Sequence, residues 1–268
     1  MSDPLGLIAY RSWINESLVS LFHEAYRLAK DTNPNIVVIS DDPRTGQNNI
    51  YNFSDWKGSY DIVTHQLFQR SIPNIDIFGF LSKRLADLSG AKDVWPVTHV
   101  EEYPASFTPE EVLDLLSNAV RGGATGFHFY LRDIIGLRAG VKHLVHEYCG
   151  APDRYQVEMS ALKLVNQIPY LNFPEPDAAL FTDTDSLRAQ KNKSLLDQTL
   201  YAFLGYGAGV WFKFINEDSP MSLSDYKFIV SAENEYIKEE TLERLQSYVR
   251  DGGILLLLNP KAFSFKIG

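Results

Sequence analysis

The residues best suited to chemistry follow two apolar runs in the first half of the chain. The run at residues 94–103 turns acidic at its end, where Glu101 and Glu102 are adjacent. The run at residues 123–133 ends in alternating polar and aromatic side chains. In an (α/β) barrel the carboxyl ends of the parallel strands carry the active site. A carboxylate at one strand end, facing an aromatic and polar end on the next strand, suggests hydrolysis of a glycosidic bond.

The two glutamates lie on opposite faces of the predicted strand. Because side chains alternate along a strand, His99 shares a face with Glu101, and Val100 shares the other face with Glu102. A barrel interior near its mouth accommodates the polar pair His99 and Glu101, whereas Val100 suits the side that faces the helices. We therefore favour Glu101 as the reactive carboxylate and keep Glu102 as the alternative. On these residues alone, two solvated loop carboxylates are the simpler interpretation.

Further polar and aromatic residues stand near the ends of other predicted strands. His65 and Gln66 lie near the end of the run at 61–68 and could hydrogen-bond sugar hydroxyls or orient the reactive carboxylate. A lone histidine at a strand end is more often a structural hydrogen-bonding group, so this alternative stays open for His65. Trp56 lies in the polar stretch 41–59, where it could stack on a sugar ring or fix the loop to the barrel.

The strand predicted from residue 126 onward carries three candidate binding residues on one face. His128, Tyr130 and Arg132 are spaced two residues apart, so their side chains point to the same side of the strand. We predict that these three side chains contribute to a carbohydrate-binding surface.

Helical and strand patterns alternate along the chain, which predicts right-handed βαβ units and parallel sheets. One helix start is clear, because Thr108, Pro109 and Glu111 supply the N-cap, the first turn and the capping box. Other helices are predicted at 13–30, 75–88, 194–204 and 239–250, and residues 137–168 look largely helical. Strands are predicted at 35–40, 61–68, 178–182, 209–214, 226–230 and 254–258.

Prolines at three positions within residues 169–176 mark a domain boundary. The predicted fold class is therefore α/β with two units, at residues 1–168 and 169–268. The alternative is one compact barrel in which residues 255–258 form the last strand. The prolines and the long helical segment before them argue against that alternative.

Composition restricts the partners and the location of the protein. A net charge of −9 and a pI near 5.2 argue against nucleic acid or an anionic membrane as a partner. Cys149 is the single cysteine, which excludes an internal disulfide and a multi-cysteine zinc site. The N-terminus lacks the regions of a secretory signal, and no apolar run approaches the roughly 18 residues of a membrane span. We expect a cytoplasmic protein.

Competing chemistries find less support in the sequence. The glycines at 205–209 precede a strand instead of opening a helix, so they do not form a phosphate-binding loop. His143 and His146, with Glu147 beside them, lack a convincing third metal ligand and fit a solvated helix face. Cys149 precedes the second unit, which disfavours an amidotransferase nucleophile. We expect no metal and no other cofactor.

Several phrases of the sequence resemble the β-galactosidase-like glycoside hydrolases of the large retaining barrel clan. The resemblance is strongest to members in which a flavodoxin-like, amidotransferase-like domain follows the barrel. It implies that residues 1–168 are the C-terminal half of a (β/α)8 TIM-type barrel, strands five to eight, and that residues 169–268 are part of the later domain. Residues 60–64, 94–102 and 122–130 resemble barrel strands six, seven and eight, and residues 223–230 and 248–255 resemble the later domain.

The family's retaining mechanism uses two carboxylates about 5 Å apart, a nucleophile and an acid/base. By resemblance, Glu101 or Glu102 is the nucleophile and Tyr130 is the nearest match to an aromatic platform, although the tryptophan frequent there is absent. The acid/base belongs after the fourth strand, which this sequence does not contain. The resemblance therefore implies a chain that is inactive alone.

The same resemblance implies a carbohydrate substrate and an architectural role for the later domain. Half a barrel leaves the edges of its sheet uncovered, so we expect self-association, a complementary chain, or cover from the later domain. The alternative function is a noncatalytic carbohydrate-binding or assembly module.

Overall fold

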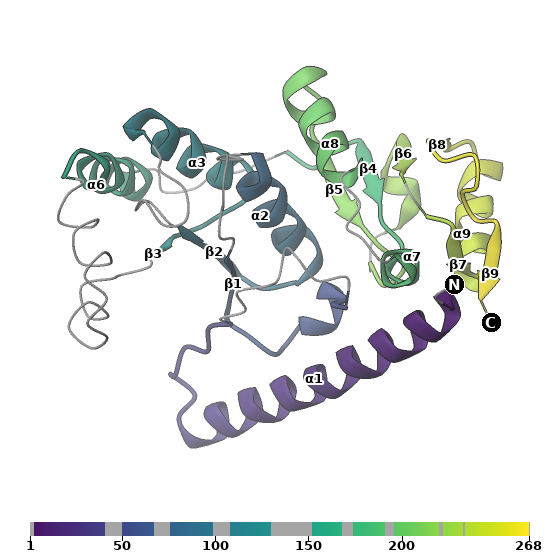
Figure 1. The fold of residues 1–268 in the computed structure, drawn as a ribbon, viewed down its shortest axis with the longest axis horizontal. Helices are drawn as coiled ribbons and strands as arrows, with labels where there is room; N and C mark the ends of the chain where they lie inside the picture. The colour runs from purple at the N-terminus through teal and green to yellow at the C-terminus, as the bar shows by residue number, and fades with distance from the viewer. Residues whose placement is uncertain are drawn as a thin grey trace.

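The computed structural model describes residues 3–40, 50–66, 76–98, 108–129, 152–167, 174–190, 196–219, 222–232 and 234–267, and the structural statements below concern these residues. They form two parallel sheets flanked by helices, together with a small sheet of two strands (Figure 1). The chain thus has the mixed α/β architecture that its sequence predicts.

The first sheet has the strand order β1-β2-β3, and all pairs are parallel. In register, Gln66 lies opposite Val97, and Thr98 lies opposite Phe129, so the carboxyl ends of the strands meet at one edge. Its strands are β1 (Ile62–Gln66), β2 (Asp93–Thr98) and β3 (His128–Phe129).

Helices connect these strands as in a barrel of βα units. α2 (Asp76–Leu88) joins β1 to β2, α3 (Pro109–Arg121) joins β2 to β3, and α6 (Pro152–Gln167) packs on α3 (Figure 1). The close approach of α2 to the end of α3 requires glycine, because a Cβ atom at Gly122 would lie 2.3 Å from the carbonyl oxygen of Gly79.

The capping box predicted at the start of α3 is confirmed. The N–H of Glu111 donates to Thr108 Oγ1 at 3.2 Å, and the N–H of Thr108 donates to Glu111 Oε2 at 2.8 Å. Two backbone donors at the helix start are thereby paired, which fixes where α3 begins.

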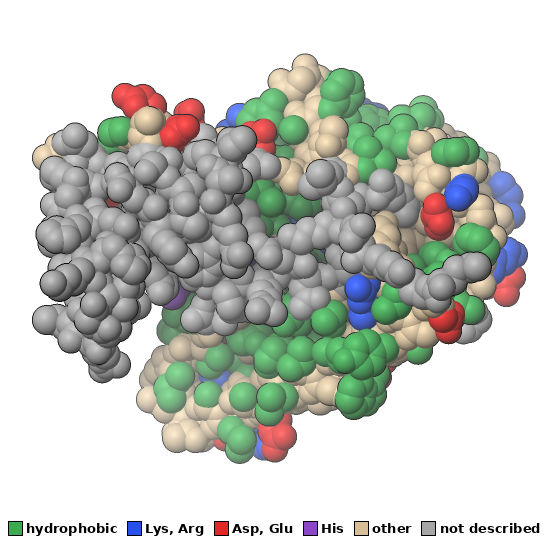
Figure 2. Space-filling view, viewed as in Figure 1, with side chains coloured by type: hydrophobic (Ala, Val, Ile, Leu, Met, Phe, Trp, Pro, Cys, Tyr) green, Lys and Arg blue, Asp and Glu red, His purple; other side chains and the backbone are tan. Residues whose placement is uncertain are grey.

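The first helix, α1 (Pro4–Thr32), is longer than the helix predicted at 13–30. Asp3 caps it by accepting the N–H of Leu5 at 3.1 Å. One face of α1 packs on the protein and buries Ile8 and Asn15. Apolar side chains remain on the lower side of the molecule, where α1 runs (Figure 2). Five large ones on this helix are more than half exposed: Leu5, Tyr10, Trp13, Leu21 and Leu28.

The prediction of a strand over residues 35–40 is wrong in its length. These residues run beside β1, but only an isolated bridge joins Ile39 to Ile62. The reason is local competition for hydrogen bonds, because the N–H of Val38 donates to the Asp61 carboxylate at 2.8 Å instead of to a neighbouring strand. Lys30 also donates to the carbonyl oxygen of Ile36 at 2.6 Å.

The second sheet has the strand order β5-β4-β6-β8, again with parallel pairs. Because β8 belongs to this sheet and not to β1-β2-β3, the alternative of one compact barrel is wrong. The strands are β4 (Ala178–Phe181), β5 (Phe212–Ile215), β6 (Phe228–Ser231) and β8 (Ile254–Leu257). The helical segments are α7 (Thr184–Ala189), α8 (Leu196–Ala202), the π-helix η2 (Phe203–Gly207), the 3-10 helix η3 (Leu223–Asp225) and α9 (Glu239–Arg250).

The last strand of this sheet is less covered than a central strand. β8 lies at the edge, and the side chains of Ile254, Leu256, Leu257 and Leu258 are 46–56% exposed. The apolar sequence of β8 predicts a strand that is buried on both faces, and this prediction is wrong. The short strands β7 (Tyr236–Lys238) and β9 (Phe265–Ile267) form the two-stranded sheet nearby, in which Tyr236 stacks on Phe265.

The two larger sheets share one hydrophobic core. α2 lies between them, and its Phe80 packs against Tyr201 and against Phe214 of β5, with ring centroids 5.9 and 5.6 Å apart. Lys83 of α2 lies over the ring of Trp211, with 4.2 Å from Nζ to the centroid. The predicted boundary between units 1–168 and 169–268 stays a prediction, since residues 168–173 lie outside the described ranges.

No helix in the described ranges combines the length and the apolar character that a bilayer span requires.

Candidate functional site

The carboxyl ends of β1, β2 and β3 form the first candidate site. β2 is the middle strand, so the residues that follow Thr98 start between the ends of β1 and β3. The predicted nucleophile Glu101, its alternative Glu102 and the predicted binding residues His99, Tyr130 and Arg132 all lie outside the described residues. The same is true of the possible metal ligands His143, His146 and Glu147 and of Cys149, which also lie outside the described residues.

His65 is placed on the side of β1 that faces α2. Its Nε2 atom lies 2.9 Å from Ser82 Oγ, its ring lies 5.8 Å from that of Phe78, and no part of it is exposed. Burial lowers the pKa of His65 to about 3, so the imidazole is neutral near pH 7. These contacts support the structural alternative for His65 and leave no surface for a sugar to touch. Gln66 is the last residue of β1, opposite Val97.

Trp56 is also enclosed. It belongs to the 3-10 helix η1 (Phe53–Trp56), and only 2% of it is exposed. The geometry supports the alternative in which Trp56 fixes the loop to the protein, because its ring is surrounded by the rings of Phe22, Tyr51, Phe53 and Tyr60. His128 differs, since it begins β3 opposite Val97 and is exposed.

A second cluster of polar residues lies at the carboxyl ends of β4, β5 and β6. Asp183 follows β4 and caps α7 by accepting the N–H of Ser186 at 2.9 Å. Glu217 follows β5 and accepts the N–H of Thr184 at 3.1 Å. Asp183 and Glu217 are both buried, and Asp183 Oδ2 has no hydrogen-bond partner within the described ranges.

Burial dominates the electrostatics of this pair of carboxylates. Burial, and next the charge of Glu217, raise the pKa of Asp183 well above its usual range. Burial also raises the pKa of Glu217 to about 7, against the opposing effect of the hydrogen bond from Thr184. Near neutral pH the pair therefore holds less than two negative charges and can accept or release a proton.

The usual ligand position of such a sheet is occupied by the protein itself. In open α/β sheets ligands bind where neighbouring connections leave in opposite directions, here between β4 and β6. Asn234 fills this position: its Oδ1 accepts the N–H of Asp183 at 2.9 Å, and its Nδ2 donates to the Phe181 carbonyl and to Ser231 Oγ. The cluster is thus a closed polar core, and acid/base chemistry on a substrate would require it to open.

Sequence reasoning missed this cluster. A signal was present, because Asp183 directly follows the predicted strand 178–182 and Glu217 lies three residues after the predicted strand 209–214. What the sequence could not show is that Asn234 returns from a later loop to close the crevice.

A polar network ties the two sheets together on the side of α1. Asn52 Nδ2 donates to Asp218 Oδ2 at 2.6 Å, and Asn216 Nδ2 donates to Asn52 Oδ1 at 2.9 Å. Arg188 donates to Ser12 Oγ at 3.0 Å and to Asp185 at 3.3 Å. These bonds hold the carboxyl ends of β4 and β5 against the start of the chain.

Metal-binding residues do not converge in the described part of the chain, where no group of three His, Cys, Asp or Glu side chains could hold an ion.

Comparison with known proteins gives a fold but no sequence match. A scan against protein-family models and a search of curated proteins each return nothing. Among solved structures, the β-galactosidase of Bacillus circulans sp. alkalophilus matches with a TM-score of 0.75 and 18% identity, over 97% of this chain and 41% of that chain. The β-galactosidase of the haloarchaeon Halorubrum lacusprofundi matches with a TM-score of 0.73 and 19% identity, over 97% and 43%.

A third match is the GH42 exo-carrageenase of Bacteroides ovatus, with a TM-score of 0.72 and 12% identity, over 97% of this chain and 40% of that chain. The chain therefore spans about two fifths of the length of these structures. The matches agree with the parallel β1-β2-β3 sheet and its connecting helices, which correspond to part of a TIM-type barrel. This chain has the partial-barrel fold of the β-galactosidases that it resembles.

Proposed function

We propose that this chain is the nucleophile-bearing part of a retaining, β-galactosidase-like glycoside hydrolase. The observation that carries the proposal is the central place of β2 in a parallel sheet whose fold matches these enzymes. A residue shortly after Thr98 starts from the middle of the row of strand ends, where a nucleophile must meet the substrate. Glu101 is the proposed nucleophile and Glu102 the alternative.

The second carboxylate of the mechanism is proposed to come from a segment outside these 268 residues. A retaining glycosidase needs two carboxyl groups about 5–5.5 Å apart. Within the described ranges, β1, β2 and β3 end in Gln66, Thr98 and Phe129, none of which is a carboxylate. The buried pair Asp183 and Glu217 belongs to the other sheet and is closed by Asn234. The chain alone should therefore lack general acid catalysis.

The proposed substrate contacts surround the same strand ends. Gln66, His99, His128, Tyr130 and Arg132 are the candidates that follow or end the three strands. His65 and Trp56, which are buried behind the sheet and under the loop, are proposed to support this surface instead of touching the sugar.

The test compares two β-galactosides that differ in the leaving group. Departure of 4-nitrophenol benefits from an acid, whereas 2,4-dinitrophenol is a good enough leaving group to depart without one. We expect no turnover of the first substrate and a slow single release from the second, with a galactosyl group on the Glu101 peptide by mass spectrometry. Added azide should turn this single release into repeated turnover, since a small anion can replace the base-activated water and remove the galactosyl group from Glu101.

The other possible outcomes of this experiment lead to different conclusions. A label on Glu102 identifies the alternative nucleophile. Turnover of 4-nitrophenyl galactoside that Glu101→Gln abolishes would contradict the missing acid/base. If neither a label nor a release is observed, the result favours a noncatalytic carbohydrate-binding or assembly module. The burial of His65 and Trp56 supports this alternative.

We also propose that the partial barrel associates with a second copy or a complementary chain. Exposed apolar side chains support this proposal. They lie on α1 and, beside β1, at Ile36, Val37 and Ile39, and they form an apolar surface that a partner could cover. Light scattering over a range of concentrations tests it, and a species that remains monomeric would count against it.

A further inference from the structure

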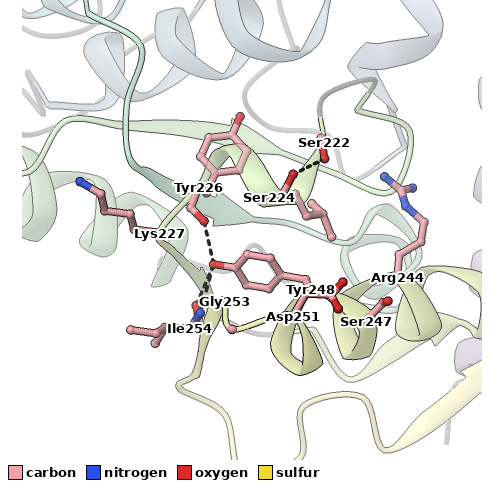
Figure 3. Close-up of a pocket in the computed structure, with 12 residues that line it drawn as sticks. Ser222, Ser224, Tyr226, Lys227, Arg244, Ser247, Tyr248, Asp251, Gly253 and Ile254 are labelled. Carbon is pink, nitrogen blue, oxygen red and sulfur yellow. Dashed lines mark hydrogen bonds between the residues drawn. The ribbon is translucent and has the colours of Figure 1, made fainter.

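A groove lies beside the starts of β6 and β8 in the second sheet (Figure 3). Its walls come from η3, from the last turns of α9 and from the residues that lead into β6 and β8. Its volume is about 690 Å³, which lies within the range of roughly 300–1,000 Å³ that small-molecule sites occupy.

The floor of the groove is rigid. The Tyr248 hydroxyl accepts the N–H of Ile254 at 3.2 Å and lies 3.2 and 3.3 Å from the carbonyl oxygens of Tyr226 and Ile254 (Figure 3). Gly253 lies against the Tyr248 ring, where a Cβ atom would come within 2.2 Å of the ring carbons. Gly252 has a φ of +99°, a conformation that favours glycine. The floor is therefore held in place by the bonds of the Tyr248 hydroxyl to the backbone and by the close packing of Gly253 on the Tyr248 ring.

The walls present both hydrogen-bond donors and acceptors. The Ser222 and Ser224 hydroxyls lie 2.6 Å apart on one wall. The Ser247 hydroxyl and the Asp251 carboxylate line the other wall. Arg244 gives one N–H to the carbonyl oxygen of Glu217 at 2.7 Å and retains further N–H groups.

The charges around the groove disfavour a charged ligand of either sign. Lys227 is paired with Asp177 outside the groove, and the two other charged residues that line it, Arg244 and Asp251, have opposite signs. The groove also faces the C-terminal end of α9, where the helix dipole is negative and opposes an anion. A neutral ligand with many hydroxyls matches this lining, because each hydroxyl can donate to Asp251 or accept from Arg244.

We propose that this groove binds a short neutral carbohydrate, at a site separate from the strand ends of β1, β2 and β3. The site makes no use of Glu101 and is independent of the proposed hydrolytic chemistry.

Amide resonances of the whole 268-residue chain provide a local test. Glycine amides are resolved in a distinct region of the ¹H–¹⁵N spectrum, so Gly252 and Gly253 report on the groove and not on the barrel. Titration with lactose should shift both resonances in a saturable way, with a dissociation constant in the millimolar range. Inorganic phosphate, the probe for an anionic ligand, should shift them little.

Matched variants test the assignment of the walls. Asp251→Asn should weaken lactose binding about tenfold, because it removes a charge-assisted hydrogen bond. Asp225→Asn is the control, since it makes the same change in charge on η3 without lining the groove. Ser224→Trp, which fills the groove, should abolish the shifts.

Three results would overturn the proposal. These are lactose shifts absent at Gly252 and Gly253, phosphate shifts larger than those of lactose, and equal affinities for Asp251→Asn and Asp225→Asn. Because the readout is confined to the groove, its failure would leave the nucleophile assignment untouched.

Discussion

The Asp87 carboxylate, near the end of α2, accepts the backbone N–H of Phe214 in β5 at 2.8 Å. The same oxygen lies 3.1 Å from Lys83 Nζ, and both side chains are nearly enclosed. One carboxylate thus completes the hydrogen bonding of an edge strand in the second sheet from a helix that belongs to the first.

Replacement of Asp87 should strongly destabilise the protein. Asp87→Ala leaves the Lys83 ammonium and the Phe214 N–H without their partner in a dry environment, a loss of about 3–5 kcal/mol. Urea unfolding measures this change. Asp114→Ala, which removes an exposed carboxylate from α3, should change stability by less than about 0.5 kcal/mol. Equal losses in the two variants would show that Asp87 does not join the sheets.

The buried pair Asp183 and Glu217 should make stability depend on pH. Burial raises the pKa of Glu217 to about 7 from its ordinary value of 4.5, so the folded chain binds this proton more tightly than the unfolded chain. The contribution to stability is complete below pH 4.5 and is lost as the pH rises through about 7. Asp183, whose pKa is also raised, acts in the same direction.

Glu217→Gln mimics the protonated carboxyl and should flatten this loss between pH 5 and pH 8, as measured by urea unfolding at each pH. Glu243→Gln, on the exposed side of α9, provides the control and should keep the slope of the parent chain. A slope that is unchanged in Glu217→Gln would mean that this carboxyl is ionised in the folded protein at all these pH values.

Truncation of two tryptophans should change the free energy of unfolding by very different amounts. Trp56→Ala removes a buried ring that four aromatic neighbours enclose, and we expect a loss of about 3–5 kcal/mol. Trp13→Ala removes a ring that is 62% exposed on α1, and its effect on the free energy of unfolding should stay within about 0.5 kcal/mol. Thermal unfolding followed by circular dichroism distinguishes the two. A small effect of Trp56→Ala would reopen a role in sugar stacking.

Local signals in the sequence predicted most of the elements. The capping box at Thr108 and Glu111 depends on residues three apart, and it locates α3 within one residue of the observed start. The apolar runs that became β1, β2, β4 and β6 were predictable for the same reason, since burial on both faces leaves a continuous apolar stretch.

The remainder depends on contacts between distant residues. Short segments such as α7 and β7 have too few residues for a periodic signal, and their partners lie far along the chain: Ser186 bonds to Tyr236, fifty residues away. The same holds at the candidate site. The side of the sheet on which His65 points is set by Ser82 and Phe78 of α2, and the closure of the second crevice is set by Asn234.

The exposed edge strand β8 determines how this protein will behave when it is concentrated. Its net charge of −9 keeps molecules apart at long range, but salt screens that repulsion over about 10 Å. At contact, the run from Ile254 to Leu258 presents five successive apolar residues without a lysine or proline among them, and no described strand pairs with the outer edge of β8. We therefore expect colloidal association along this edge, and not the loss of folded structure, to set the highest concentration at which the isolated chain can be handled.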